Sequence, residues 1–159
     1  MRIGIGYDIH RLVSGRPLML GGVRIASECG LEGHSDADAL LHAISDALLG
    51  ALALGDLGHH FPDSDPRYAG IASVKLLQKV LEMVQDQHYK LHNLDAVVIA
   101  QKPRLAAYIP AIRRNVAELL AADLGSVSVK AKTAESLGAL GRSEGIAVHA
   151  VCLITSGSR

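Results

Sequence analysis

The sequence predicts an α+β domain in which helices lie on one face of a mixed four-stranded sheet, with a small extra β-hairpin. Segments 71–88 and 105–122 carry apolar residues at helical spacing, and segment 35–56 is apolar almost all round. Short apolar runs with strand character precede and follow these segments. With 159 residues, 49% of them hydrophobic, the chain is expected to fold as a single domain over 1–159.

The first quarter of the chain is expected to be extended. Residues 1–12, MRIGIGYDIHRL, are typical of a strand. Residues 17–25 are expected to form a hairpin that turns at Gly21 and Gly22, because adjacent glycines favour tight turns. The next segment, SECGLEG, contains two glycines and is expected to be a loop.

The segment 35–56 is expected to be a long helix. Ser35 is its predicted N-cap, Asp38 lies near the capping-box position, and Gly55 is close to its end. Because almost every face of the helix is apolar, we expect it to be deeply buried. The stretch 58–66 has two prolines and several turn-forming residues, which predict a loop.

The second half of the chain alternates between predicted helices and strands. Segments 71–88 and 105–122 are the expected amphipathic helices. The run 94–101 is rich in branched residues and is expected to be a strand covered on at least one face. Segment 127–133 alternates and predicts a half-exposed strand, whereas 145–155 does not alternate and predicts a buried one.

The composition argues against several classes of protein. Sixteen basic residues balance sixteen acidic ones, so nonspecific binding to nucleic acid is not suggested. Cys29 and Cys152 form no C-x-x-C pair, which favours buried thiols in a reducing compartment, with the cytoplasm as the expected location. The N-terminus lacks a basic region followed by an apolar stretch, so a signal peptide is not expected. The longest apolar run, 47–55, is far shorter than a membrane span.

The sequence also contains candidate metal ligands. Asp8 and His10 lie two positions apart in a predicted strand, so their side chains point to the same face. His42 lies between Asp38 and Asp46 on one stripe of the apolar helix. If the strand and helix meet, Asp8, His10 and His42 form a site with three ligands and one open position, as in catalytic zinc centres. Asp38 or Asp46 is then expected to orient an imidazole.

An alternative without metal stays open on spacing alone. In it, His42 is a core histidine bonded to Asp38 or Asp46, and Asp8 merely pairs with His10.

Several motifs, in order along the chain, resemble the 2-C-methyl-D-erythritol 2,4-cyclodiphosphate synthase family. They are GYDIH at 6–10, HSDADALLHAISDALLGALALGDLGHHFPDSDP at 34–66, AQKPRL at 100–105 and KAKTAESLGALGRSEGIA at 130–147. The resemblance covers essentially the whole chain. It implies a cyclising lyase of non-mevalonate isoprenoid biosynthesis, which converts 4-diphosphocytidyl-2-C-methyl-D-erythritol 2-phosphate into the cyclic diphosphate and CMP by metal-assisted intramolecular phosphoryl transfer.

The resemblance also assigns roles to particular residues. It implies one Zn²⁺ per subunit, held by Asp8, His10 and His42, and a Mg²⁺ or Mn²⁺ ion at Glu135 with the substrate diphosphate. His34 and Ser35 match residues that contact phosphate, and Thr133 matches a residue that stabilises the phosphates during transfer. His34 and Thr133 are the candidate catalytic residues. The residues that match substrate-contacting positions are Asp8, Ile9, His10, His34, Ser35, Asp56, Leu57, Gly58, Phe61, Pro62, Asp63, Ser64, Asp65, Ala100, Gln101, Lys102, Pro103, Arg104, Leu105, Ala106, Lys132, Thr133, Ala134, Glu135, Ala139 and Arg142.

The family further implies a homotrimer with active sites between subunits. The zinc ligands come from one subunit and the cytidine-binding segment 100–106 from the next, and an isoprenoid diphosphate is an optional ligand of an axial cavity near Arg142. The apolar helix and the strand 145–154 suggest more burial than one small domain needs, which trimerisation would use. Two residues depart from the family's usual pattern. Lys132 replaces a threonine, which places a positive charge either near the phosphates or away from them, and Ala139 replaces an aromatic residue that in relatives forms a wall beside the axial cavity.

Two other functions stay open at this point. A zinc phosphohydrolase has the same ligands but uses metal-bound water to attack the diphosphate. A binding module without catalysis uses Asp8, His10 and His42 only to fasten a strand to a helix.

Overall fold

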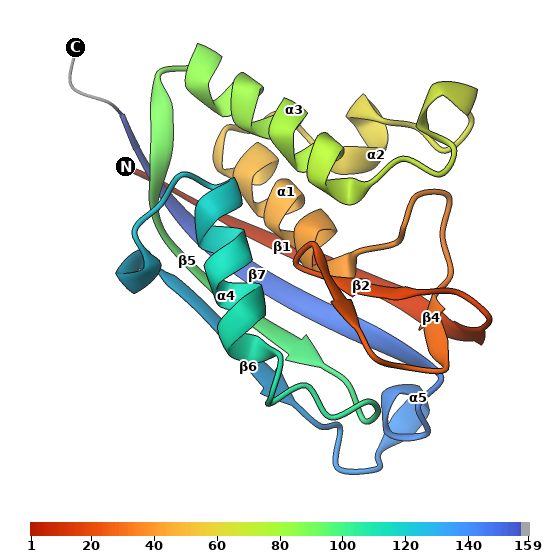
Figure 1. The fold of residues 1–159 in the computed structure, drawn as a ribbon. Helices are drawn as coiled ribbons and strands as arrows, with labels where there is room; N and C mark the ends of the chain where they lie inside the picture. Colours follow the sequence, from red (N-terminus) through yellow and green to blue (C-terminus); the bar gives the residue numbers. More distant parts are fainter. Residues whose placement is uncertain (157–159) are drawn as a thin grey trace.

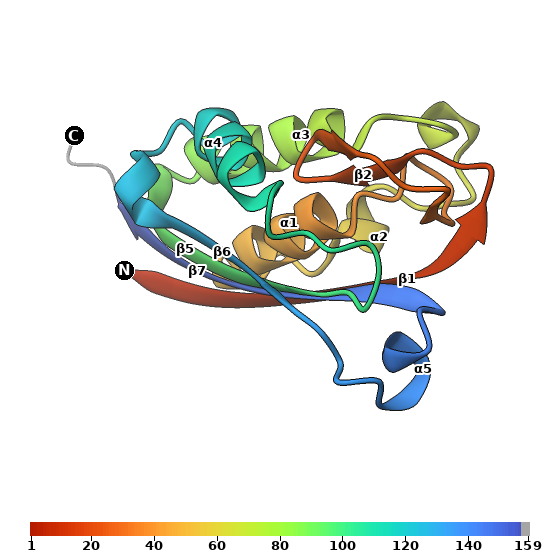
Figure 2. The same ribbon diagram turned by 60° about the horizontal axis from the view of Figure 1, so that its bottom comes forward.

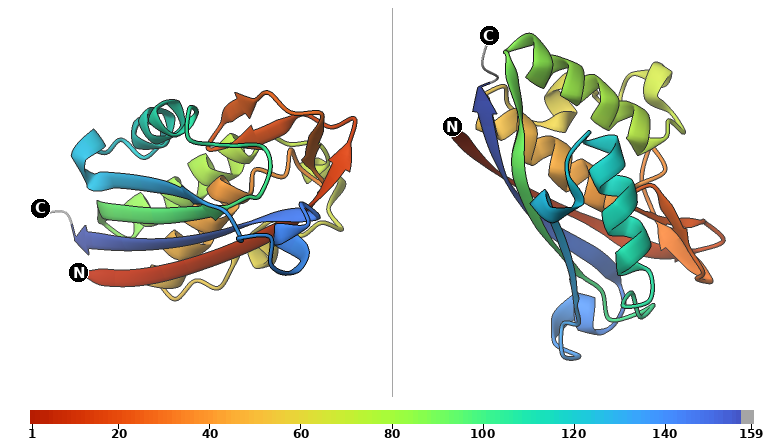
Figure 3. Two further views of the ribbon diagram at one scale, coloured as in Figure 1. Left: turned by 90° about the horizontal axis from the view of Figure 1, so that it is seen from below. Right: turned by 60° about the vertical axis from the view of Figure 1, so that its left-hand side comes forward.

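Five strands form the main sheet in the computed structural model, which describes residues 1–156. The strand order is β4-β1-β7-β5-β6, and Figure 3 shows the four long strands side by side. Only β5 and β6 are parallel, so the sheet is mixed as predicted. The strands are β1 (Arg2–Ser14), β4 (Cys29–Leu31), β5 (Tyr89–Ile99), β6 (Val127–Lys132) and β7 (Gly145–Ser156).

The prediction of four strands is wrong because of β4. This strand lies in the segment expected to be a loop, and it pairs with Leu12 to Ser14 at the end of β1. Three residues are too few to show an alternating pattern, and Gly30 breaks the apolar run. Backbone pairing with β1 therefore creates a strand that its own sequence does not predict.

The predicted hairpin is confirmed as a separate two-stranded sheet, β2 (Leu18–Leu20) and β3 (Val23–Ile25). Its turn residues have positive φ, 61° at Gly21 and 73° at Gly22, which glycine adopts without steric cost. Both turn N–H groups donate to the carboxylate of Asp38, at 2.9 and 2.6 Å. This fully buried carboxylate fastens the hairpin to the start of the central helix.

The central helix, α1, runs over Ala39–Ala51 and is shorter at both ends than predicted. Ser35 is not its N-cap; Asp38 is, and its side chain accepts a hydrogen bond from the N–H of Leu41 at 3.1 Å. The left-handed conformation of Ala37, with φ of 55°, prevents the helix from beginning at Ser35.

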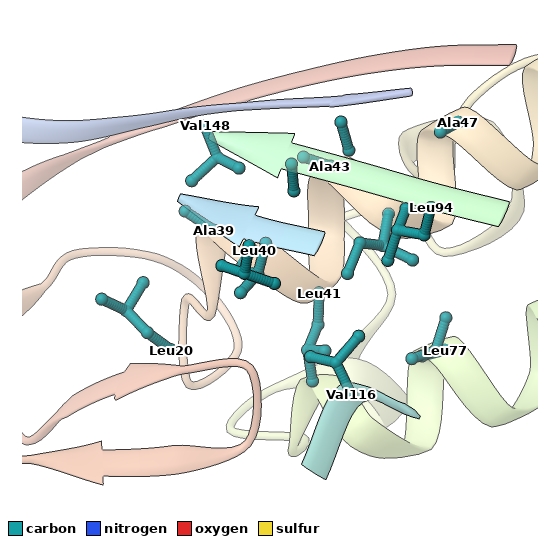
Figure 4. Packing of buried hydrophobic residues seen from close by; sticks show 14 of the residues in the cluster. Leu20, Ala39, Leu40, Leu41, Ala43, Ala47, Leu77, Leu94, Val116 and Val148 are labelled. Atoms are coloured by element: carbon teal, nitrogen blue, oxygen red, sulfur yellow. The ribbon is translucent and has the colours of Figure 1, made fainter. Parts of the chain in front are cut away.

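The apolar faces of α1 are all covered within the chain. Figure 2 shows α1 between the sheet and an upper layer made of α3 (Ser73–Asp86), α4 (Ile109–Leu119) and the hairpin. Close to α1, Leu20, Leu77 and Val116 from that upper layer pack in one apolar cluster with Leu41 (Figure 4). The burial that the sequence suggested for a trimer is therefore not on this helix.

Two glycines let α1 lie directly on β1. A Cβ atom added at Gly6 would lie 1.9 Å from the carbonyl oxygen of Ala43, and one at Gly4 would lie 1.9 Å from that of Ala47. Side chains at these positions would push strand and helix apart, so glycine is required by the close approach of two backbones. This contact places the first half of β1 against the middle of α1.

The expected loop at 58–66 contains a short helix. α2 covers Leu57–His60. Asp56 is its N-cap, and the Asp56 side chain accepts a hydrogen bond from the N–H of His59 at 2.8 Å. Another four-residue helix, α5 (Gly138–Gly141), lies on the other side of the sheet from α1 to α4 (Figures 1 and 2). No helix within residues 1–156 is long and apolar enough to cross a membrane.

The face of the sheet opposite α1 exposes a row of apolar side chains on β1. Ile3, Ile5, Tyr7 and Ile9 are 71%, 69%, 49% and 49% exposed. Val151 of β7 is paired with Ile5 and continues the row. The prediction of a buried 145–155 strand is thus right only for its first half. We call this row of five residues the outer apolar face.

Candidate metal centre

Asp8, His10 and His42 converge on one point between β1 and α1. The Oδ2 atom of Asp8 lies 2.9 Å from Nε2 of His10 and 3.1 Å from Nδ1 of His42. The two imidazole nitrogens are 3.3 Å apart. The alternation of β1 turns Asp8 and His10 to the helix side, and the glycine contact brings His42 within reach. The predicted meeting of strand and helix is confirmed.

The remaining polar atoms of Asp8 and His10 are already hydrogen-bonded. Nδ1 of His10 lies 2.6 Å from the carbonyl oxygen of Glu32, which can only accept, so this nitrogen carries the hydrogen. Oδ1 of Asp8 accepts from the N–H of Ile9 at 2.9 Å. Nε2 of His10 and Oδ2 of Asp8 are therefore left with lone pairs directed at the shared point.

The pKa values respond to how closely the carboxylate and the two imidazoles approach one another. Burial raises the pKa of Asp8, but hydrogen bonds and charge from His10 and His42 outweigh it, and the pKa falls well below its usual range. Burial lowers the pKa of His10, but the Asp8 carboxylate and the Glu32 carbonyl outweigh it and raise the pKa overall. The cluster thus attracts positive charge at its centre, which a proton or a cation can supply.

The donor set fits a divalent transition metal. In tetrahedral zinc sites with bonds of about 2.0–2.2 Å, neighbouring ligand atoms are about 3.3 Å apart. The three separations of 2.9, 3.1 and 3.3 Å are close to that value. Two imidazoles and one carboxylate oxygen are also the ligands that catalytic zinc centres use. Asp8, His10 and His42 are the only such cluster of potential ligands within residues 1–156.

The second nitrogen of His42 has partners that the sequence did not predict. Nε2 lies 2.8 Å from the hydroxyl oxygen of Ser73 and 3.3 Å from that of Ser35. The expectation that Asp38 or Asp46 orients this imidazole is wrong, because Asp38 binds the hairpin turn and Asp46 accepts from the N–H of Leu57. Ser73 begins α3, far from His42 in sequence, so spacing gave no signal for it.

A cavity of about 260 Å³ opens onto the three ligands. Several residues predicted to contact substrate line it together with Asp8, His10 and His42: His34, Ser35, Leu57, Gly58, Phe61 and Asp63. His34 and Ser35 are consecutive residues of the loop before α1, and Asp63 lies in the loop after α2. Sequence reasoning missed Tyr68 and Ile71, which also line this cavity, and it expected Asp46 behind an imidazole rather than in the lining. The chain thus assembles a pocket with both polar and apolar walls beside the candidate metal centre.

The predicted residues of segments 100–106 and 132–142 form a second group outside this cavity. Five more predicted residues, on β1 and beside α2, are not part of the lining either: Ile9, Asp56, Pro62, Ser64 and Asp65. Ala100 and Lys132 are joined by a backbone hydrogen bond of 2.9 Å, and the hydroxyl of Thr133 donates to the carboxylate of Glu135 at 2.5 Å. Gln101 to Arg104 line another cavity, of about 600 Å³, with Leu12, Cys29 and Ser143 among its walls. Neither group of residues appears in the lining of the other cavity. One chain therefore holds two halves of the predicted site apart.

The fold and the ligand set together define an α+β domain with a candidate metal site beside a pocket. The YgbB family model matches residues 1–155, and the chain belongs to this family. It is 59% identical over 157 residues to a 2-C-methyl-D-erythritol 2,4-cyclodiphosphate synthase of Desulforamulus reducens, covering 99% of this chain and 100% of the relative.

Solved structures agree with this assignment. The bifunctional IspDF of Campylobacter jejuni matches with a TM-score of 0.95 and 39% identity, over 99% of this chain but only 42% of that longer one. A CDP complex of IspF from Plasmodium falciparum matches with a TM-score of 0.87 and 34% identity, over 99% of this chain and 97% of that one.

Proposed function

We propose that the protein converts 4-diphosphocytidyl-2-C-methyl-D-erythritol 2-phosphate into 2-C-methyl-D-erythritol 2,4-cyclodiphosphate and CMP, in the non-mevalonate pathway to isoprenoids. The observation that carries this is the convergence of Asp8, His10 and His42 in the lining of a pocket, in a chain whose full-length relatives carry that name. The enzyme is then a phosphorus–oxygen lyase with a single catalytic domain over 1–159.

The reaction needs positioning more than it needs a nucleophilic side chain. An oxygen of the substrate's 2-phosphate attacks the β-phosphorus of its diphosphate, and the bond from that phosphorus to the CMP oxygen breaks. Zinc bound by Asp8, His10 and His42 would supply Lewis-acid stabilisation of the phosphate charge. No water enters the products.

The chain's own residues hold the reacting groups. His34 and Ser35 face the pocket and are proposed to bind phosphate oxygens. Asp63, in the loop after α2, is proposed to accept a hydrogen bond from an erythritol hydroxyl.

The second group of residues completes the proposed site. Thr133 is proposed to stabilise the phosphates and Glu135 to hold the Mg²⁺ or Mn²⁺ that accompanies the diphosphate, since carboxylate oxygen suits hard cations. The segment 100–106 is proposed to read the cytosine edge through backbone groups.

The products distinguish cyclisation from hydrolysis. With the cytidine substrate in oxygen-18 water, we expect phosphorus NMR to show a cyclic diphosphate and mass spectrometry to find no label in it or in CMP. A phosphohydrolase built on the same ligands would give a linear bisphosphate, with oxygen-18 in one product. That second result would contradict the proposed reaction and support the hydrolase instead.

A homotrimer would bring the two halves of the site together. In this proposal the metal centre of one subunit faces the segment 100–106 and Glu135 of its neighbour. The separation of the two cavities in one chain supports it. So does the outer apolar face, because a contiguous exposed apolar patch on a sheet is typical of a protein interface.

Replacing Ile5 by Glu is expected to dissociate this assembly. Ile5 lies in the middle of the outer apolar face, so an interface there would bury the new charge without a partner. Analytical ultracentrifugation should find trimers of the unaltered protein and monomers of Ile5→Glu, with activity lost and zinc still bound. Leu124→Glu, at an exposed leucine in the turn before β6 that is not part of this face, is the control and should stay trimeric. A monomeric unaltered protein would contradict the proposal.

Two further expectations stay proposals. The free cysteines Cys29 and Cys152 support a reducing compartment such as the cytoplasm. An isoprenoid diphosphate is proposed to bind near Ala139 and Arg142 on the trimer axis. Because Arg142 donates to Glu144 at 2.6 Å, the ligand would have to compete with that carboxylate.

A further inference from the structure

A chain of hydrogen bonds leads away from the metal centre through His42. Nε2 of His42 lies 2.8 Å from Oγ of Ser73, and the Ser73 hydroxyl makes a very short hydrogen bond to Oδ1 of Asp36. The backbone N–H of Ser73 donates to the same carboxylate oxygen at 3.0 Å. Ser73 is 1% exposed, so water does not compete for these contacts.

The hydrogens in this chain can be assigned from its acceptors. The ionised carboxylate of Asp36 can only accept, so the single hydroxyl hydrogen of Ser73 points to Asp36. Oγ of Ser73 is then left to accept from Nε2 of His42, which must carry the imidazole hydrogen. The lone pair of a neutral His42 therefore lies on Nδ1, the nitrogen that faces Asp8 and His10.

The second contact of Nε2 is consistent with this assignment. Oγ of Ser35 lies 3.3 Å from Nε2 and accepts from the N–H of Ala37 at 3.0 Å. When Nε2 of His42 donates, the hydroxyl hydrogen of Ser35 is not needed there. It is free to point into the pocket, where Ser35 is proposed to bind phosphate.

From this geometry we infer that Ser73 and Asp36 are positioning residues for the metal centre: they hold the His42 ring and keep its hydrogen on Nε2, so that Nδ1 is the metal donor. This inference rests on the proposed metal-dependent function. Partners of this kind behind ligating histidines raise ligand basicity and fix ring orientation. Asp36 lies in the loop before α1 and Ser73 at the start of α3, so their contact also holds α3 beside the metal centre.

Zinc affinity of the purified full-length protein tests the inference. We expect Ser73→Ala to weaken zinc binding about 10-fold or more in a chelator competition, the effect usual for such partners. The matched control is Ser45→Ala, because Ser45 is an equally buried serine that donates only to the backbone of Leu41. It should bind zinc within about twofold of the unaltered protein. In zinc-loaded protein with labelled histidine, Nε2–H of His42 should exchange slowly with solvent, and faster in Ser73→Ala.

A second pair of variants separates positioning from a general loss of structure. Asp36→Asn keeps an acceptor oxygen at Oδ1 and should retain most of the zinc affinity, whereas Asp36→Ala should lose it like Ser73→Ala. Equal zinc affinity in Ser73→Ala and Ser45→Ala would overturn the inference, as would equal losses in both Asp36 variants. If Asp8→Asn also binds zinc as tightly as the unaltered protein, the metal centre itself is wrong. If Asp8→Asn alone loses zinc affinity, the metal centre is supported and the positioning role of Ser73 and Asp36 is contradicted.

Discussion

Replacing Asp8 by Asn is expected to lower zinc content and CMP release together. Asn keeps the shape of Asp8 but removes the negative charge that attracts a cation to His10 and His42. Removing a hydrogen-bond partner of a metal ligand typically lowers metal affinity by about 10–100-fold, so removing a charged ligand itself should lower it by at least about 100-fold. Zinc content by atomic emission and CMP release by chromatography, on the same preparation, measure both effects.

A carboxylate outside the site provides the matched control for Asp8→Asn. Asp95 is an exposed residue of β5 whose ion pair with Lys130 lies on the surface. Asp95→Asn should therefore keep full zinc content and activity. Circular dichroism should give the same fold for both variants. Turnover by Asp8→Asn without zinc would show that the metal has no part in the reaction.

Most of the fold followed from patterns within single segments. The helix over 71–88 and the hairpin at Gly21 and Gly22 have local causes, helical spacing in one and adjacent turn glycines in the other. The short strand β4 exists because β1 offers it a backbone edge, and no local pattern records that. The start of α1 was misplaced because the conformation of Ala37 depends on surrounding contacts, among them the Ser35 hydroxyl that binds its N–H.

The metal centre was predictable for a different reason. Asp8 and His10 share a face because strands alternate, and His42 is conspicuous as a polar residue on an apolar helix. Ser73 was not predictable, since a serine at the start of an amphipathic helix looks like an ordinary helix-terminal residue. Its role depends on how α3 packs beside α1, which is a property of the tertiary structure.

Replacing Gly6 by Val is expected to disrupt both the fold and the metal centre. The new side chain would meet the backbone of Ala43, where a Cβ alone lies 1.9 Å from the carbonyl oxygen and cannot be relieved by rotating a side chain. We expect a loss of more than about 3 kcal/mol in the free energy of unfolding. Because Ala43 follows His42, separating α1 from β1 also moves that ligand away from Asp8.

Urea unfolding at one fixed protein concentration measures the loss, since any assembly makes stability depend on concentration. Gly125→Ala is the matched control, because a Cβ there meets nothing within 4 Å and its backbone needs no glycine. It should stay within about 0.5 kcal/mol of the unaltered protein. The free energy of unfolding of Gly6→Ala should fall between those of Gly6→Val and Gly125→Ala. Gly6→Ala should also bind zinc more weakly than Gly125→Ala. Equal unfolding midpoints for the Gly6 and Gly125 variants would mean that β1 and α1 do not approach as closely as the metal centre requires.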